Sequence, residues 1–384
     1  MTRKKLTRRE FLKMTALAGG GAVLASCGGG PQATAALPDL STGNAIPLDE
    51  LAAAAQTEGQ LSVIALPRDW ANYGKMIDTF KERYGLVVNE LFPDAGSGDE
   101  IEAIRSNRES RGPQAPDTLD IGLGFVQAAT EEGLFAKYRV STWDTIPDSV
   151  KHPEGYWYGD YYGVLAFEGN LDVVQTMPED WEDLLKPEYV NMFALAGEPT
   201  TSAEANYTVW AAGLSRTGSL DTAAEAGLEF FAEMNQAGVL LPTTANTSTI
   251  ARGETPLTVE WDYLALANRD QYAGNPPTAV IVPKTGVLAG PYAQAISAFA
   301  PHPYAARLWM EFQYSDEGQL IFLEGYAHPI RYNDLAARNV IPAELAALLP
   351  PAEAYAAAAF PTVDQVNTAK EYIATNWRSV VYGE

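Results

Sequence analysis

Short apolar runs alternate with helical stretches along this chain, and this alternation restricts the fold more than any other feature. Residues 61–66, 86–91 and 118–123 are apolar, partly β-branched runs of strand length. Residues 76–84 and 100–110, which lie between them, are predicted helices. Strands separated by helices favour parallel βαβ units with right-handed crossovers. The sequence therefore predicts an α/β fold.

The same alternation continues along the rest of the chain. Further strands are predicted at residues 163–167, 256–259 and 278–282. Further helices are predicted at residues 180–185, 203–214, 222–233, 292–299 and 304–312. The last fifty residues are rich in alanine and are expected to be mostly helical.

The charge distribution excludes nucleic acid as a partner. The 384 residues include 26 Lys and Arg and 49 Asp and Glu, and residues 1–27 hold six of the basic side chains and one acid. From position 28 onward, 20 basic residues therefore face 48 acidic ones, a formal charge of −28. Such a body repels phosphate backbones. Cys27 is the single cysteine, so the chain beyond it has no disulfide, thiolate cluster or cysteine nucleophile.

The first 27 residues have the layout of an export signal, with a basic stretch followed by an apolar one. The stretch around Arg8 and Arg9 resembles the twin-arginine export motif, and the residues ending at Cys27 resemble a bacterial lipobox, whose cysteine is lipidated. The alternative is a general signal peptide with an incidental cysteine. Residues 28–47 are expected to be a flexible tether. These features predict a lipid-anchored protein on the outer face of the cytoplasmic membrane.

The sequence contains no pattern typical of an enzyme site. No dinucleotide-binding, P-loop or nucleophile-elbow motif occurs. His152, His302 and His328 lie far apart and form no metal-binding pair. His328 is either a loop histidine or a contact in a binding cleft. We therefore expect no catalysis, no cofactor and no bound metal.

Four segments resemble a known family. Residues 59–63, 178–189, 300–309 and 314–319 are similar to bacterial extracellular solute-binding proteins of ABC importers, in particular those for ferric ion, thiamine, phosphonates and polyamines. The resemblance extends from about residue 58 to the C-terminus. The resemblance implies a type II periplasmic-binding-protein fold with two lobes, each a mixed sheet flanked by helices. Lobe 1 is expected at residues 48–169 and 276–384, and lobe 2 at residues 170–275. Crossing strands at 163–170 and 278–284 would form the hinge.

Ligand-binding side chains are expected in loops at strand ends, which is where open α/β sheets bind ligands. The aromatic run at residues 155–162 either packs in a sheet or, as the Gly and Asp between the rings favour, forms a partly exposed loop. Thr200, Thr201 and Ser202 precede a helix and either cap it or hold an anion. The full set of candidates is Trp70, Tyr73, Tyr158, Tyr161, Thr200, Thr201, Ser202, Trp261, Asp262, Tyr263, Tyr326 and His328.

The residues after strand 256–259 bear most directly on the ligand. Ferric-binding relatives carry two adjacent tyrosines here, whereas this chain has Trp261, Asp262 and only one tyrosine, Tyr263. An indole beside a carboxylate is typical of sites for organic cations. The leading prediction is a nitrogenous cation such as a polyamine or thiamine, and the alternatives are ferric ion and a phosphonate-type anion. The expected partners are this solute and the permease and ATPase of the importer, and the protein is expected to be a monomer.

Overall fold

The structure is a computed structural model that describes residues 37–350, 352–355 and 357–384, with the backbone alone at 352 and 353. Residues 38–384 form one compact unit. Cys27 and the expected signal peptide lie outside the described residues. The end of the expected tether contacts the body, because the Arg139 N–H donates to the Gly43 carbonyl at 2.8 Å and the Tyr304 hydroxyl donates to the Pro38 carbonyl at 2.9 Å.

The first sheet has the strand order β2-β1-β3-β8-β5. Strands β1, β2 and β3 are parallel, as predicted, and β8 runs antiparallel between β3 and β5. The short strands β4 and β9 pair with β8 and β5. The bounds are β1 (Gln60–Ile64), β2 (Val87–Leu91), β3 (Thr118–Gly122), β4 (Phe135–Ala136), β5 (Trp157–Asn170), β8 (Ala289–Ser297) and β9 (His328–Pro329).

Strand β5 is shared with a second sheet. Its first part pairs with β8, and its last residues pair with β6 (Leu257–Trp261) and β7 (Thr278–Ile281). The expected crossing at 163–170 therefore lies within one continuous strand that joins the two sheets. The other expected crossing forms β7, an edge strand of the second sheet.

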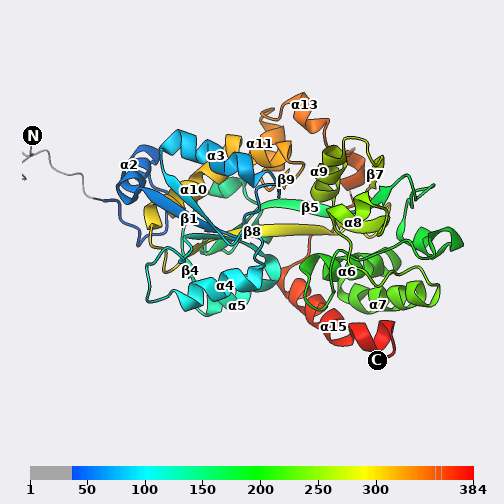
Figure 1. Cartoon of the computed structure of the whole chain (residues 1–384). Coiled ribbons are helices and arrows are strands. Elements are labelled where there is room, and N and C mark those ends of the chain that lie inside the picture. Colours follow the sequence, from blue (N-terminus) through cyan, green and yellow to red (C-terminus); the bar gives the residue numbers. More distant parts are fainter. Residues whose placement is uncertain (1–36, 351, 356) are drawn as a thin grey trace, which may run out of the picture. The chain divides into compact units, whose positions relative to one another are not determined.

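Helices cover both faces of each sheet (Figure 1). Helices α2, α3, α10 and α11 lie on one side of the first sheet, and α4 and α5 lie on the other. Around the second sheet, α8 and α9 lie opposite α6 and α7. The helices of the first sheet are α2 (Leu48–Glu58), α3 (Tyr73–Tyr84), α4 (Ser97–Ser106), α5 (Leu123–Glu131), α10 (Pro303–Gln313) and α11 (Asp316–Glu324). The others are α6 (Ala203–Thr217), α7 (Leu220–Gln236), α8 (Thr247–Ala251), α9 (Asp262–Tyr272), α12 (Tyr332–Ala337), α13 (Ala343–Ala346), α14 (Ala352–Tyr355) and α15 (Val363–Val381). Four 3-10 helices are η1 (Trp143–Thr145), η2 (Asp148–Val150), η3 (Trp181–Leu185) and η4 (Pro187–Tyr189).

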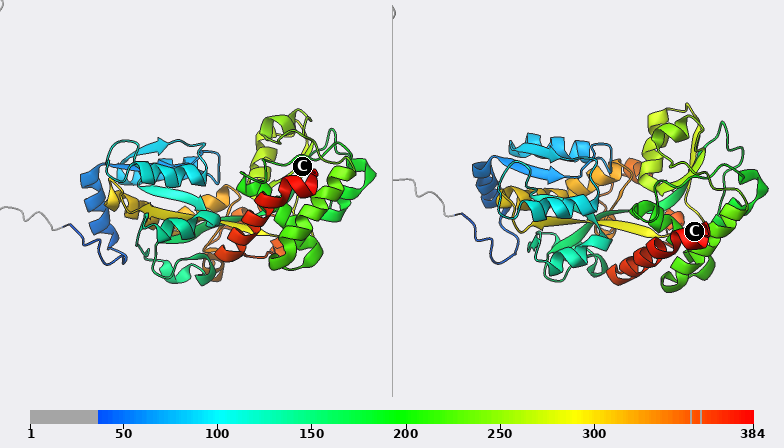
Figure 2. Two further views of the ribbon diagram at one scale, coloured as in Figure 1. Left: turned by 90° about the horizontal axis from the view of Figure 1, so that it is seen from below. Right: turned by 60° about the horizontal axis from the view of Figure 1, so that its bottom comes forward.

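Helix α15 contacts elements from both sheets. It packs against α5 from the first and against α6 and α7 from the second, and Figure 2 shows it (red) running past these helices. Its buried stripe includes Ile373, Trp377 and Val381, and the Trp377 ring centroid lies 5.6 Å from that of Phe231 on α7. The amphipathic spacing of these residues explains why this long helix docks along one face.

Two predictions from the sequence are wrong. Residues 292–299 were expected to form a helix, but residues 292–297 belong to the buried strand β8 and the last two form a turn. For the aromatic run at 155–162 the favoured loop is wrong and the alternative of sheet packing holds, because β5 begins at Trp157 and Tyr158 and Tyr161 are fully buried. In both cases neighbouring strands supply the hydrogen bonds and the burial, and this tertiary context overrides local propensity.

Candidate functional site

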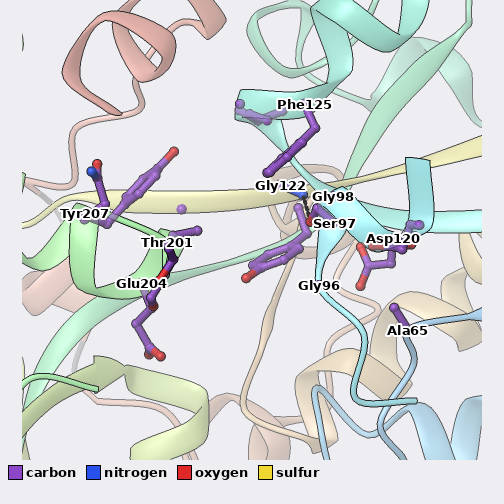
Figure 3. Close-up of a pocket in the computed structure, with 18 of the residues that line it drawn as sticks. Ala65, Gly96, Ser97, Gly98, Asp120, Gly122, Phe125, Thr201, Glu204 and Tyr207 are labelled. Carbon is purple, nitrogen blue, oxygen red and sulfur yellow. Dashed lines mark hydrogen bonds between the residues drawn. The ribbon is translucent and has the colours of Figure 1, made fainter. Parts of the chain in front are cut away.

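A cavity of about 580 Å³ lies beyond the ends of β1 and β3. Ala65 follows β1, Gly122 ends β3, and both line the cavity. The first turns of α4, α5 and α6 also line it, so elements from both sheets contribute (Figure 3). We call this space the cleft cavity. Its position agrees with the expectation that ligands bind beyond the carboxyl ends of the strands.

The walls of the cleft cavity are held by local hydrogen bonds at these helix ends. Ser202 caps α6, because its Oγ accepts the Ala205 N–H at 3.2 Å. Ser97 at the start of α4 accepts the Gly122 N–H at 3.1 Å and thereby fixes α4 against the end of β3. Helix N-termini present free N–H groups and a positive partial charge. This part of the wall can therefore bind acceptor or anionic groups.

Lys370 on α15 supplies the one amine of the cavity wall. Its Nζ lies 3.8 Å from the ring centroid of Phe125, and partial burial lowers its pKa. Within the described part of the chain, Lys370 forms no ion pair with a carboxylate.

Carboxyl groups outnumber amines in the wall of the cleft cavity. Glu204, in the first turn of α6, accepts the Trp261 N–H at 2.8 Å through Oε1. Burial, together with the neighbouring Glu260, raises the pKa of Glu204 well above its usual range. Four further acids line the same cavity: Asp94, Asp99, Glu100 and Asp120. Figure 3 shows Glu204 and Asp120 on opposite sides of the cavity.

Aromatic rings complete the wall. The indole of Trp261 packs against Gly290 on β8, where an added Cβ atom would lie only 2.0 Å from the ring. Glycine is therefore required at this position for the strand and the ring to pack. Trp261 also contacts Tyr207, with ring centroids 5.5 Å apart, and Trp70 contacts Tyr292 at 5.7 Å. All four rings line the cleft cavity.

A buried hydrogen-bond network lies directly behind this wall. Trp70 donates from Nε1 to the Tyr161 hydroxyl at 2.6 Å, and Tyr161 donates to Oδ2 of Asp120 at 3.0 Å. The Tyr73 hydroxyl lies 2.8 Å from the same Oδ2 and 3.1 Å from Oδ2 of Asp160. We call these five residues the acid–tyrosine network.

The structure brings only some of the predicted site residues to the cleft cavity. Five of them line it: Trp70, Thr200, Thr201, Ser202 and Trp261. Tyr73 and Tyr161 lie one layer behind, in the acid–tyrosine network. Five others do not line the cavity: Tyr158, Asp262, Tyr263, Tyr326 and His328.

Asp262, the expected partner of a cation, is fully buried outside the cleft cavity. Its Oδ1 accepts the Val164 N–H at 3.0 Å and its Oδ2 accepts the Tyr355 hydroxyl at 2.7 Å. Burial raises the pKa of Asp262 to about 7 and lowers the pKa of nearby His328 to about 4. Both oxygens of Asp262 are therefore bonded within the protein, where they join strand β5 to Tyr355.

Sequence analysis missed Glu204, Asp120 and Lys370. Glu204 lies two residues after Ser202 of the predicted Thr-Thr-Ser cap, so its place in the first turn of a helix was a usable signal. Asp120 interrupts a predicted apolar strand. A carboxyl group in a buried strand needs a polar partner, so this position was also a usable signal. Lys370 lies in a long terminal helix, and no local pattern links it to the cavity.

Neither a metal centre nor a membrane span is found in the described ranges. No group of three or more His, Cys, Asp or Glu side chains there is arranged to hold a metal ion. No described helix is long and apolar enough to cross a membrane.

Comparisons with known proteins identify the family. Residues 117–368 match the family model for bacterial extracellular solute-binding proteins. A comparison with curated protein sequences gives no match. Among solved structures, the chain is similar to the periplasmic binding protein AfuA from Actinobacillus pleuropneumoniae, with exogenous fructose-6-phosphate bound, at 18% identity and a TM-score of 0.64 over 84% of this chain and 98% of that one.

Two further structures show the same likeness. Iron-bound HitA from Pseudomonas aeruginosa is 19% identical, with a TM-score of 0.64 over 84% of this chain and 99% of that one. An ABC transporter substrate-binding protein from Bradyrhizobium japonicum is 18% identical, with a TM-score of 0.66 over the same shares. These identities establish the fold alone, which is the predicted type II periplasmic-binding-protein fold. Because the family model covers most of the chain, the protein belongs to the bacterial extracellular solute-binding proteins.

Proposed function

We propose that the protein binds a small nitrogenous organic cation, such as a polyamine or thiamine, and delivers it to an ABC permease. The observation that carries this proposal is the composition of the cleft-cavity wall, which holds five carboxyl groups and one amine among the described residues. A cation in the cavity would neutralise carboxyl groups that otherwise lie close together in a desolvated space. The protein would act by binding alone, and the ATPase of the importer would supply the energy.

The aromatic rings support the same ligand class. Trp70, Trp261, Tyr207 and Tyr292 surround the space next to Glu204. Aromatic faces attract cations, and a nearby carboxylate adds a charge-assisted hydrogen bond. A second cavity of about 270 Å³ shares Trp70 and Glu204 with the first and is also lined by Asp69 and Glu260. This continuation of the acidic surface suits an elongated cation with more than one amino group.

A solute with a phosphonate or carboxylate group is the second candidate. It is favoured by Lys370 and by the first turns of α4, α5 and α6, which all line the cleft cavity. The ferric alternative has less support, because Tyr161 and Tyr263 are fully buried and do not line this cavity. Iron would need several such hard oxygen ligands.

Calorimetric titration of the purified body against a panel of solutes tests the ligand class. We expect putrescine, spermidine or thiamine to bind in the micromolar range or tighter, because a desolvated cation pairs with the excess carboxyl groups. Phosphate, a phosphonate, fructose-6-phosphate and ferric citrate are the competing probes. Binding of one of these anions or of iron, with no cation bound at millimolar concentration, would show that the proposed ligand class is wrong.

We also propose that Cys27 carries a lipid that holds the protein at the outer face of the membrane, with export by the twin-arginine route. Membership of an extracellular family supports export, and the lipobox-like sequence supports the anchor. Replacing Cys27 with alanine should move the exported protein from the membrane fraction to the soluble fraction without changing solute affinity. Cell fractionation and blotting measure this, and a Cys27→Ala protein that stays in the membrane fraction would contradict the anchor.

A further inference from the structure

The second cavity, of about 270 Å³, adjoins the cleft cavity at Trp70 and Glu204, which line both. We call it the side pocket. Its other polar lining residues come from several elements and include Glu260 on β6, Asn268 on α9 and Thr247 on α8. Among the described residues, no basic side chain lines the side pocket. A cation that enters it therefore meets acids and amides and no opposing charge.

Glu260 is the buried acid that faces the side pocket. It is 6% exposed, and its Oε2 accepts a hydrogen bond from Nδ2 of Asn268 at 3.1 Å. Its Oε1 accepts no hydrogen bond among the described residues and, unlike Oε1 of Glu168, is not fully shielded from solvent. A buried carboxyl oxygen without a donor is uncommon and needs an explanation. Because Glu260 lines the side pocket, a solute there can supply the missing donor.

Asn268 holds Glu260 in this orientation. Its Nδ2 donates to Oε2 of Glu260 and to Oε2 of Glu168, each at 3.1 Å, and its Oδ1 accepts the Thr247 hydroxyl at 3.1 Å. An amide nitrogen has two N–H groups, and both are used here. Asn268 therefore has no further N–H group for Oε1 of Glu260.

Glu260 is also the acid of this pair that can ionise. Burial, together with the neighbouring Glu260 carboxyl group, raises the pKa of Glu168 more than burial raises the pKa of Glu260. Glu168 is completely buried and does not line the side pocket, so the proton of the pair stays on Glu168. A cation in the side pocket favours the charged form of Glu260, because an opposite charge nearby stabilises a carboxylate.

Glu204 and Trp70 form the passage between the two cavities. Oε1 of Glu204 accepts the Trp261 N–H at 2.8 Å, and its Oε2 accepts no hydrogen bond among the described residues. The indole of Trp70 is held in place, because its Nε1 donates to the Tyr161 hydroxyl at 2.6 Å. A methylene chain that leaves the cleft cavity would pack along this ring, and an ammonium group at its end would reach Glu260.

We propose that the side pocket binds a second ammonium group of the solute, which donates a hydrogen bond to Oε1 of Glu260 while the first ammonium group stays in the cleft cavity. This inference rests on the proposed function and narrows its substrate class to linear diamines and polyamines, in preference to thiamine and monoamines. A primary ammonium group has three N–H donors. It can therefore serve Oε1 of Glu260 and Oε2 of Glu204 together.

Two amines test the inference on the unmodified protein. Putrescine and butylamine share a four-carbon chain and differ by one ammonium group. We expect calorimetric titration to show that putrescine binds at least about 30-fold more tightly, because its second ammonium group pairs with a desolvated carboxylate.

Glu260→Gln assigns this difference to the side pocket. The substitution keeps the size of the side chain but cannot ionise, so it should weaken putrescine binding at least about tenfold. It should leave butylamine binding within about threefold, because butylamine has no second ammonium group. Asp270→Asn is the charge control, because Asp270 is an exposed acid on α9 that bonds to Arg269 and Tyr326 outside the side pocket. It should keep both affinities within about threefold.

A second variant fills the side pocket without changing its charge. Ala267 on α9 lines the side pocket but not the cleft cavity. Leucine suits a helix as well, so Ala267→Leu should fold. It should weaken putrescine binding at least about fivefold and leave butylamine binding within about threefold, because the added side chain occupies the volume that the second ammonium group needs.

The outcomes separate the two levels of the proposal. If butylamine binds as tightly as putrescine, or if Glu260→Gln and Ala267→Leu weaken both amines by the same factor, the inference is wrong and the proposed function stands. If none of the cations binds the wild-type protein, the proposed function is wrong and the inference falls with it. Circular dichroism establishes whether Glu260→Gln is folded, and Ala267→Leu decides the matter if it is not.

Discussion

Glu204→Gln should weaken binding of the cationic solute by about 30- to 1000-fold, or about 2–4 kcal/mol, which is the range for one member of a desolvated charge pair. The substitution removes the ability to ionise beside a bound cation but keeps the Oε1 atom, which accepts the Trp261 N–H at 2.8 Å. The first turn of α6 and the position of the indole should therefore persist. Calorimetric titration of the wild type and the variant with the tightest cation of the panel measures the effect.

Asp262→Asn is the matched comparison for Glu204→Gln. Asp262 is also a buried acid on a neighbouring segment, but it lies outside the cleft cavity and bonds to Val164 and Tyr355. We expect this variant to bind the solute within about threefold of the wild type. If Asp262→Asn loses as much solute affinity as Glu204→Gln, or more, the solute binds at the Trp261–Asp262 pair that the sequence suggests.

The free energy of unfolding should fall as the pH rises from 5 to 7, by at least about 1.4 kcal/mol per pH unit, which corresponds to one net proton. Burial raises the pKa values of Asp160, Glu260 and Asp262 to about 7 and that of Glu168 to about 9. These acids are protonated in the folded protein but ionised in the unfolded chain over this range. The native state therefore binds more protons, and their stabilising contribution is lost as the pH rises through the folded-state values.

His328 acts in the opposite direction over part of this range. Burial lowers its pKa to about 4, so between pH 4 and 6.5 the unfolded chain binds the extra proton at this residue. One histidine offsets at most one of the four acids. Urea unfolding of the solute-free protein at pH 5, 6 and 7 measures the slope, and Asp262→Asn should make it shallower. A stability that is constant or rises over this range would show that these acids are ionised in the folded state.

The order of the elements in the first sheet could be predicted from sequence because each element carries a local signal. Helix α3 begins close to the expected position and ends at Gly85, whose φ of 68° matches the left-handed C-cap that glycine favours. Strands β1, β2 and β3 are short apolar runs between turn residues, and their bounds agree within two residues of expectation. Such elements can be predicted without knowing which other elements pack against them.

Strand β8 could not be predicted in this way. Its sequence, Ala289–Ser297, is rich in alanine and glycine and contains Pro291, a composition with low strand propensity. It is a strand because β3 and β5 lie on either side and supply the hydrogen bonds. Its small residues are required by packing, as Gly290 shows by accommodating the Trp261 ring.

The residues of the candidate site also differ in whether the sequence predicts their position. The Thr-Thr-Ser cap and Trp261 line the cleft cavity because each follows or precedes an element with a clear local pattern. Asp262 immediately follows Trp261, but the first turn of α9 directs it toward Val164 and Tyr355. A neighbouring position in sequence therefore does not guarantee a shared cavity, and the sequence contains no signal for this change of direction.

The position of α15 affects the charge of the cleft cavity, because this helix carries Lys370. The apolar stripe of α15 is anchored on α7, and Asn235 of α7 donates to the Val381 carbonyl at 2.9 Å. Its contact with α5 lies around Gly124, next to which Val366 and Lys370 pack. The sequence predicts that residues 276–384, and hence α15, belong to lobe 1, whereas these contacts tie α15 mainly to α7. If the protein opens as two lobes, we therefore expect α15 to stay with α7 and to carry Lys370 away from Phe125. The charge balance of the cleft would then differ between its open and closed forms, because closure brings the Lys370 amine against Phe125 and the wall of α5.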